Sequence, residues 1–560
     1  MARRARLRYR LGVPSTRAIV RWLAPALLAI VVMLPRLASP QFGLLDDGVT
    51  LAAGRETLDR WSSILTLVAE TGRFRPAYWL LYSAVFGVVG VRAVAFFVAN
   101  VLLFMALLGL LARLVRLSGG SSLQAALTVV VFAVCGPAVE TFYTLSKAEA
   151  FQVLCIGVSL LAAGASASEP RRARRVGLGM LAGVALLLAC MTKETTLVLI
   201  PISLGWIAIE RSSGAKRDIG ARFATTYAAV GVVAGAVFWM LRWHYSLPLA
   251  EGTYTRAYAL QIDTVGPALF RISAWIARDF AFLVPLSGAA VVIARRGRPE
   301  WRRQMLYACV WSASWLIVYL PWPATFEYYL LPFAAGAAIL AGGIAASLWD
   351  MARRDRSIAV RRVAWSTLAA SGLLWLAAIG NAAADARVQL TVDRANADLV
   401  DFLADLPTGS RIVLNTTEAN EYLYEVPLHL AEIKKRPDLR VQHVGERAPA
   451  DDPPIQTFVI TPTIADRPAL TVRIAVNESG VRRDATRLRA MLRERGELVY
   501  TTEHHARLVE FALPRLLCPV ARSPFADATY CPRDRGIVSA RTFSYGWAVH
   551  RIPAAHDESV

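Results

Sequence analysis

Apolar runs of bilayer length dominate the chain, recurring from about residue 22 to about residue 380 between short charged stretches. About 20 apolar residues are enough for a helix to cross the hydrocarbon core, and such a helix satisfies its own backbone hydrogen bonds. Hydrophobic residues make up 55% of the 560 residues, more than soluble domains usually contain. The sequence therefore predicts an α-helical polytopic membrane protein.

The charges between the runs predict its topology. We place residues 1–21, which hold seven arginines, in the cytoplasm as the flank of an uncleaved first anchor. Alternating sides from there puts most of the Lys and Arg residues before residue 381 in the cytoplasm, as the positive-inside rule requires. Topology thus explains the net charge of +20 better than nucleic acid binding does. Eleven spans are expected, at about residues 22–38, 91–112, 122–137, 150–166, 176–191, 195–210, 222–241, 280–294, 304–320, 328–349 and 363–380.

One apolar stretch, residues 76–90, is too short to be counted with the spans. Counting it as a crossing would place the basic segment Arg171–Arg175 outside the cytoplasm. We interpret it as an interfacial or re-entrant helix, because Tyr78, Trp79 and Tyr82 are residue types that suit a membrane interface.

An odd number of spans leaves residues 381–560 outside the cytoplasm, beyond an expected linker near Asn381–Arg387. This polar tail alternates helix-like and strand-like stretches, which predicts an extracytoplasmic α/β domain. The helix-like stretches are Arg394–Leu406, Glu418–Ala431 and Val481–Arg495, and the strand-like ones are Arg411–Leu414, Thr457–Thr461, Leu498–Thr502 and Ala506–Phe511. Cys518 and Cys531 would form a disulfide there or remain free thiols. The chain then divides into a cytoplasmic N-terminus (1–21), a transmembrane module (22–380, with its first outer loop at 39–75) and the outer domain (381–560).

The first outer loop carries the most informative polar residues. Asp46 and Asp47 lie a few residues after the first span, where carboxylates are costly unless solvated, paired or functional. Asp-Asp-Gly is also ordinary turn chemistry. Arg73 and Arg75 bracket a phenylalanine at the end of the same loop, where they would clamp a phosphate or contact lipid headgroups.

Further charged residues occur in the other outer loops. A reaction that needs a general base and stabilises a phosphate leaving group would use such a set if the loops converge on one cavity. Taken singly, each residue also has a structural reading, such as an ion pair between Lys193 and Glu194. The candidates are Glu149 in the second loop, Lys193 and Glu194 in the third, Arg256 and Tyr258 in the fourth and Glu327 in the fifth.

In this layout the chain resembles the GT-C superfamily of membrane glycosyltransferases, in particular the protein O-mannosyltransferase and lipid A aminoarabinose transferase branch. The resemblance covers about residues 20–350. It depends on the order and sidedness of short motifs: Leu45-Asp46-Asp47, Gly72-Arg73-Phe74-Arg75-Pro76, Pro137 followed by Glu149, Thr192-Lys193-Glu194 and Tyr328-Tyr329-Leu330-Leu331-Pro332.

The resemblance implies inverting transfer of a sugar from a polyprenyl phosphate to a glycan, lipid or protein acceptor on the outer face of the plasma (inner) membrane. Asp47 or Asp46 matches the general base, with Asp47 preferred, and Glu149 matches a second acidic residue. Many relatives carry an arginine or histidine where this chain has Glu327, which puts phosphate binding by the fifth loop in doubt. The implied phosphate-binding residues are Arg73, Arg75, Lys193 and Arg256.

Two further questions stay open in the sequence. Asp46, Asp47 and Glu149 offer hard oxygen ligands for a divalent metal, although the resembled branch mostly needs none, and we expect no cofactor. A transporter or flippase of lipid-linked substrates, or a non-catalytic envelope scaffold, is the alternative function. Transporters usually place ionisable residues near the bilayer midplane, whereas these lie at one surface.

Overall fold

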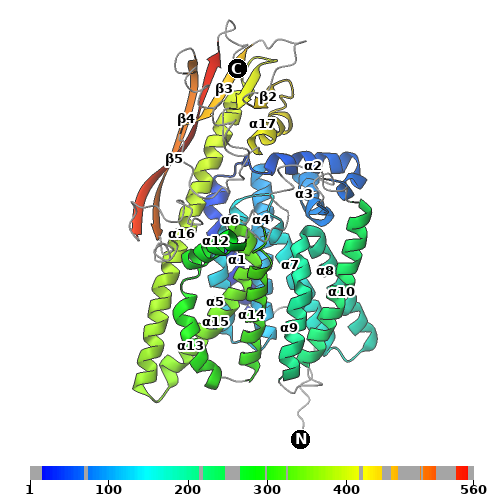
Figure 1. Cartoon of the computed structure of the whole chain (residues 1–560), viewed down its shortest axis with the longest axis vertical. Coiled ribbons are helices and arrows are strands. Elements are labelled where there is room, and N and C mark those ends of the chain that lie inside the picture. Colours follow the sequence, from blue (N-terminus) through cyan, green and yellow to red (C-terminus); the bar gives the residue numbers. More distant parts are fainter. Residues whose placement is uncertain are drawn as a thin grey trace.

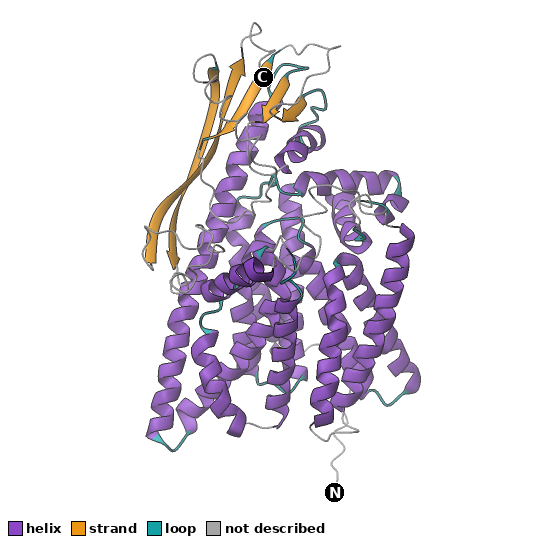
Figure 2. Ribbon diagram, viewed as in Figure 1, coloured by secondary structure: helices purple, strands orange, loops and turns teal. Residues whose placement is uncertain are grey.

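The computed structural model describes residues 16–67, 73–212, 219–245, 265–296, 299–322, 326–414, 421–443, 456–463, 492, 496–511 and 538–552. Within them a bundle of helices carries a small sheet at one end (Figures 1 and 2). The helices up to the sheet are α1 (Thr16–Ala38), α2 (Asp47–Asp59), η1 (Trp61–Leu65), α3 (Pro76–Val89), α4 (Ala93–Leu117), α5 (Ser122–Ala133), α6 (Gly136–Tyr143), α7 (Ala148–Ser168), α8 (Arg172–Thr192), η3 (Glu194–Val198), α9 (Leu199–Ser212), α10 (Ile219–Tyr245), α12 (Val265–Asp279), α13 (Leu283–Arg296), α14 (Pro299–Ile317), η4 (Glu327–Leu330), α15 (Leu331–Arg354) and α16 (Ile358–Ala404).

The bundle is that of a multi-pass membrane protein. Among the described residues, six helices are long and apolar enough to cross a membrane, or up to eight if each of two sharply bent pairs counts as one span. The bent pairs are α5 with α6, at 58°, and α12 with α13, at 84°. Each of the eleven predicted runs overlaps a helix, but the count of eleven spans is not confirmed.

Helix α3 coincides with the short apolar stretch that was predicted to be interfacial or re-entrant. Its aromatic residues Tyr78, Trp79 and Tyr82 are buried. They pack with Leu51 of α2 and Phe97 of α4 in one hydrophobic cluster. In Figure 1, α2 and α3 lie against the end of the bundle that faces the sheet. The aromatic side chains therefore pack against α2 and hold the segment between α1 and α3 in place.

A sheet domain, made of β1–β5 and α17, follows the bundle. The strand order is β2-β1-β3-β5-β4, in which β1 pairs in parallel with β2 and β3, while β5 pairs antiparallel with β3 and β4. This arrangement agrees with the predicted α/β class. The elements are β1 (Arg411–Leu414), α17 (Glu421–Glu432), β2 (Arg440–His443), β3 (Thr457–Pro462), β4 (Glu497–Phe511) and β5 (Val538–Ile552).

One helix joins the two parts. The 47 residues of α16 run without a break from the far end of the bundle to the sheet (Figure 1). The expected linker near Asn381–Arg387 is thus helical, while the division of the chain at residue 381 stays a prediction. The second half of α16 packs Leu399 and Leu403 into the core of the sheet domain. Its Asn396 accepts a 2.9 Å hydrogen bond from the indole nitrogen of Trp547.

A buried ion pair also fastens α16 to the start of the bundle. Arg36, near the end of α1, donates to Asp393 of α16 over 2.6 Å, and both side chains are almost wholly buried. The Arg36 guanidinium lies 4.0 Å from the ring centre of Phe97. Removing one partner of such a pair costs about 3–5 kcal/mol because a buried charge is left alone. The loop between α1 and α2 is therefore held between two fixed helices.

Candidate functional site

Asp47 is the first residue of α2, and its carboxylate is buried in a pocket of polar groups. Only 3% of the residue is exposed. One oxygen accepts a 2.7 Å hydrogen bond from the Gly43 amide, and the other accepts from the Ser146 hydroxyl at 3.1 Å. Burial raises the pKa of Asp47 to about 7, although the Gly43 hydrogen bond opposes the rise. A carboxyl group with that pKa is suited to accept a proton near neutral pH.

Two strained residues meet at Asp47. Asp46 (φ 67°) and Ser146 (φ 61°) are two of the three non-glycine residues with positive φ in the described part of the chain. The Ser146 hydroxyl donates to the Asp46 carbonyl at 3.1 Å and shares a 2.6 Å hydrogen bond with Thr50. Left-handed backbone costs about 1–2 kcal/mol per L-residue and tends to occur at functional sites. The Asp46 backbone is thus tied to the loop that leads into α7.

That loop continues into a second group of charges, three residues beyond Ser146. Glu149, in the first turn of α7, forms a buried ion pair with Lys193, which follows α8. Gln152, one turn along α7, donates to the hydroxyls of Thr195 and Thr196 in η3. These hydrogen bonds hold η3 against α7 and so place Lys193 opposite Glu149.

Aromatic rings and further cations surround this ion pair. The Lys193 ammonium lies 3.3 Å from the ring centre of Tyr329, and that of Lys147 lies 4.6 Å from the ring centre of Tyr328. Burial lowers the pKa of Lys193 to about 8, with Glu149 acting in the opposite direction, so Lys193 is mostly protonated at neutral pH. We use the term basic cluster for Arg73, Arg75, Lys193, Glu149 and Glu194.

The arginines of the first loop belong to this basic cluster. Arg75 forms a 3.5 Å ion pair with Glu194. Burial alone would raise the pKa of Glu194, but Arg75 and Arg73 outweigh it and lower the pKa to about 2. Among the described residues, three cations then accompany two carboxylates. Cations gathered in a partly desolvated place are what a phosphate group requires.

Glu327, the first residue of η4, belongs to a different set of charges. Its carboxylate accepts from Arg278 at 2.9 Å, and Arg278 also pairs with Asp385 of α16 and lies 3.8 Å from Asp279. We use the term acidic cluster for Arg278, Asp279, Glu327 and Asp385. The Arg278 guanidinium is thus engaged by carboxyl groups of the protein, and the substrate-binding role of Glu327 stays a prediction.

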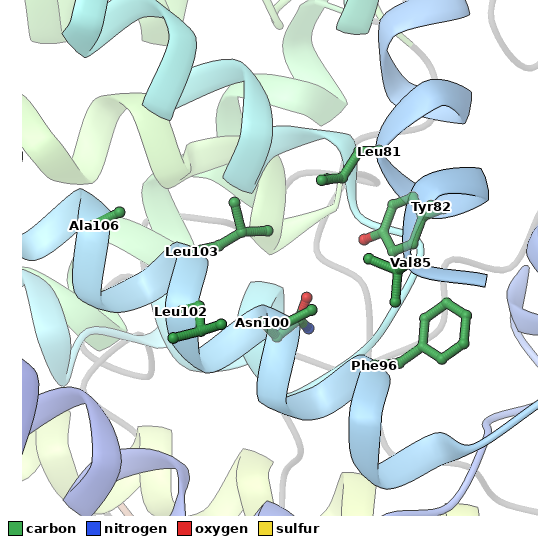
Figure 3. Close-up of a pocket in the computed structure, with 9 residues that line it drawn as sticks. Leu81, Tyr82, Val85, Phe96, Asn100, Leu102, Leu103 and Ala106 are labelled. Carbon is green, nitrogen blue, oxygen red and sulfur yellow. The ribbon is translucent and has the colours of Figure 1, made fainter. Parts of the chain in front are cut away.

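An apolar groove of about 270 Å³ opens between α3 and α4. Figure 3 shows Leu81, Tyr82 and Val85 of α3 around this space, with Phe96, Asn100 and Leu103 of α4. Tyr82 is the link to the polar site, because it also contacts the backbone of Ser146 and Lys147. The groove is thus lined mainly by hydrocarbon and ends beside the loop that joins Asp47 to the basic cluster.

The structure brings most of the predicted site residues together. Asp46, Asp47, Glu149, Arg73, Arg75, Lys193 and Glu194 lie along one continuous set of contacts through residues 146–149. The roles assigned to these residues stay predictions. Arg256, Tyr258, Cys518 and Cys531 lie outside the described residues. Within the described part of the chain, no three His, Cys, Asp or Glu side chains are placed to hold a metal ion.

The sequence did not single out the neighbours that the sheet domain supplies to Asp47. Glu425 of α17 accepts from the backbone amides of Gly48 and Val49, and His429 lies 3.4 Å from Glu425. Burial raises the pKa of Glu425 to about 8 and lowers that of His429 to about 4. The two residues are four apart in a predicted helix and therefore share one face, which is the only signal that the sequence offered.

No protein-family model and no curated protein matches the chain. Among solved structures, ArnT from Cupriavidus metallidurans bound to undecaprenyl phosphate is similar, with a TM-score of 0.50 and 14% identity over 97% of this chain and 99% of that chain. The oligosaccharyltransferase of Archaeoglobus fulgidus tethered with an acceptor peptide matches with a TM-score of 0.46 and 12% identity, over 76% of this chain and 63% of that chain. The likeness to ArnT along nearly the whole of both chains shows that this chain has the fold of ArnT, as the predicted helical membrane architecture requires.

Proposed function

We propose that this protein is a glycosyltransferase that moves a sugar from a polyprenyl-phosphate donor to an envelope acceptor, with inversion at the anomeric carbon. The observation that carries the proposal is the proximity of a buried carboxylate and a cluster of cations. Asp47 contacts Ser146, and the basic cluster begins three residues later, at Glu149. A base and an anion site are the two parts that this reaction needs.

The reaction balances with these groups alone. Asp47 accepts the proton of the acceptor hydroxyl while the hydroxyl oxygen attacks the anomeric carbon. The bond between that carbon and the phosphate oxygen breaks, and its electron pair stays on the phosphate. Lys193, Arg75 and Arg73 stabilise the negative charge that develops there. Asp47 is favoured over Asp46 as the base because its carboxylate is buried in the polar pocket and has a pKa of about 7.

The groove between α3 and α4 supports a lipid-linked substrate. Its lining is apolar, and Tyr82 places one end of it next to the polar site. The structure of similar fold, ArnT, contains undecaprenyl phosphate. We place the protein in the plasma (inner) membrane, with the N-terminus in the cytoplasm and both the polar site and the sheet domain on the opposite face.

The test is transfer by membranes that contain the wild-type chain or one variant, using a panel of radiolabelled sugars linked to undecaprenyl phosphate. We expect Asp47→Asn to lower kcat/KM by about 10²–10⁴-fold, because a general base contributes that much. Asp59→Asn is the matched control, since Asp59 is an exposed residue at the other end of α2. Wild-type transfer by Asp47→Asn would exclude Asp47 as the base, and equal losses in Asp47→Asn and Asp59→Asn would indicate damage to α2 instead.

A further inference from the structure

The first turn of α2 lacks the capping hydrogen bond that the side chain of the N-cap residue normally provides. The first amides of a helix have no partner within the helix, and an aspartate at the N-cap position usually accepts from one of them. Asp46 occupies that position, but its left-handed backbone leaves its side chain without a capping hydrogen bond. The turn that carries Asp47 therefore depends on an outside partner.

Glu425 of the sheet domain is that partner, although it lies 377 residues away in sequence from Gly48. Its two oxygens accept from the Gly48 amide at 2.6 Å and the Val49 amide at 3.1 Å. The side chain is fully buried. One side chain of α17 thus provides the hydrogen bonds that the first turn of α2 lacks.

The contact is also tight at the backbone. A side chain at Gly48 would place its first carbon 2.8 Å from a Glu425 oxygen and 2.9 Å from the His429 ring. Phe42, before the turn, meets His429 edge to face with ring centres 6.5 Å apart. At the rim of the same interface, Arg55 pairs with Glu432 at 2.5 Å, where the arginine is about half exposed. The sheet domain therefore meets α2 at a buried centre with an exposed ion pair at its edge.

We propose that Glu425 is a positioning residue for the transfer reaction, which fixes the first turn of α2 and so holds Asp47 in place. This inference rests on the proposed role of Asp47 as the base. It makes the sheet domain part of the active site, because the residue that sets the geometry of the base comes from that domain.

Glu425 also acts on Asp47 through its charge, and this gives a readout that a purely structural residue would not change. The two carboxyl groups titrate as a pair, and the charge on Glu425 opposes ionisation of Asp47. The other charged or titratable groups around them include Asp46, Lys147, Asp393, His429, Lys434, Arg36 and the α3 tyrosines Tyr78 and Tyr82. Replacing Glu425 with glutamine should therefore move the acidic limb of the kcat/KM profile to lower pH.

The kinetic experiment uses the full-length chain in membranes and the undecaprenyl-phosphate-linked sugar that the wild type transfers. We expect Glu425→Ala to lower kcat by about 10²-fold with KM nearly unchanged, since small misplacements of a catalytic group cost that much. Glu425→Asp should recover part of the activity, and Glu425→Gln should show the shifted acidic limb. Glu432→Gln, at the rim of the same interface, is the control and should behave as wild type. Wild-type kcat and pH profile in Glu425→Ala and Glu425→Gln would overturn the proposal.

A second measurement does not depend on activity. Hydrogen exchange followed by mass spectrometry should show faster exchange in the peptide around residues 43–59 for Glu425→Ala, and wild-type exchange for Glu432→Gln. If Glu425→Ala exchanges faster around residues 43–59 but the wild type transfers no sugar, the proposed function is wrong and the capping contact is supported. If transfer is normal and exchange is unchanged in Glu425→Ala, the positioning role is wrong. If Glu425→Ala does not fold, the pH profile of Glu425→Gln decides.

Discussion

The basic cluster and the acidic cluster both contact η4 and use cations and carboxylates in opposite proportions. In the basic cluster three cations accompany two carboxylates among the described residues, and the chain leads from Glu149 back to Ser146 at Asp47. In the acidic cluster Arg278 holds three carboxylates, one of them from α16. Among the described residues the basic cluster is therefore rich in cations, whereas the acidic cluster is rich in carboxylates. The difference teaches that the balance of charge, and not burial alone, distinguishes the two clusters.

The largest effect expected from this comparison is on stability, at Arg278. Arg278→Met leaves Asp279, Glu327 and Asp385 facing one another without their guanidinium. Leaving a buried charge unpaired costs about 3–5 kcal/mol, so we expect a clear fall in Tm of the detergent-solubilised protein. Arg354→Met is the control, because Arg354 is an exposed residue in a surface pair. An unchanged Tm would mean that the acidic cluster does not hold α12, η4 and α16 together.

The basic cluster should lose activity as well as stability. Lys193→Met removes the buried partner of Glu149, which costs about 3–5 kcal/mol, and it also removes a charge placed for the phosphate. We expect transfer to fall by about 10²–10³-fold, the size of effect seen when one charge-stabilising group is lost.

Binding separates the two clusters further. Undecaprenyl phosphate should raise the Tm of the wild type and of Arg278→Met, because a ligand at 100 times its Kd stabilises the folded state by about 2.7 kcal/mol. It should raise the Tm of Lys193→Met far less. Equal stabilisation of all three proteins would place the phosphate away from Lys193 and would contradict the division between the clusters.

The smallest effect expected is a change of pH profile. Transfer needs Asp47 ionised, so kcat/KM should rise with pH through about 7. It also needs Lys193 protonated, so kcat/KM should fall above about pH 8. Lys193→Arg should remove the alkaline limb and keep the acidic one, because a guanidinium stays charged throughout this range. The range from about pH 6 to about pH 9 extends about one unit beyond the two pKa values. A kcat/KM profile that is flat over this range would contradict the roles of both Asp47 and Lys193.

Much of the fold was predictable because it follows from the spacing of hydrophobic residues and from the length of the apolar runs. The strand predicted at Arg411–Leu414 has the bounds of β1, and the one predicted at Thr457–Thr461 is β3. Two predicted strands, Leu498–Thr502 and Ala506–Phe511, are parts of the single strand β4, since the polar residues between them also pair with β5 and do not end it. Strands β2 and β5 were not predicted.

The candidate site was predictable where a charged residue lies at the end of an apolar run. Asp47, Glu149 and Lys193 were found in this way, because an ionisable residue at such a place is costly unless it has a function or a partner. Arg278 and Asp279 were not, since they lie in a helix that the sequence treated as loop. Glu425 was missed for another reason: its role comes from a contact with α2, and long-range contacts leave no local pattern.

Because α16 is one continuous α-helix of 47 residues, it is a rod about 70 Å long. Its lower half exposes Val363 and Leu373, while its upper half is embedded in the sheet domain. Such a rod has no hinge, so the sheet domain tilts only if the last helix of the bundle tilts with it. A lateral force on that helix would then also move α17, and with it the contact between Glu425 and the first turn of α2.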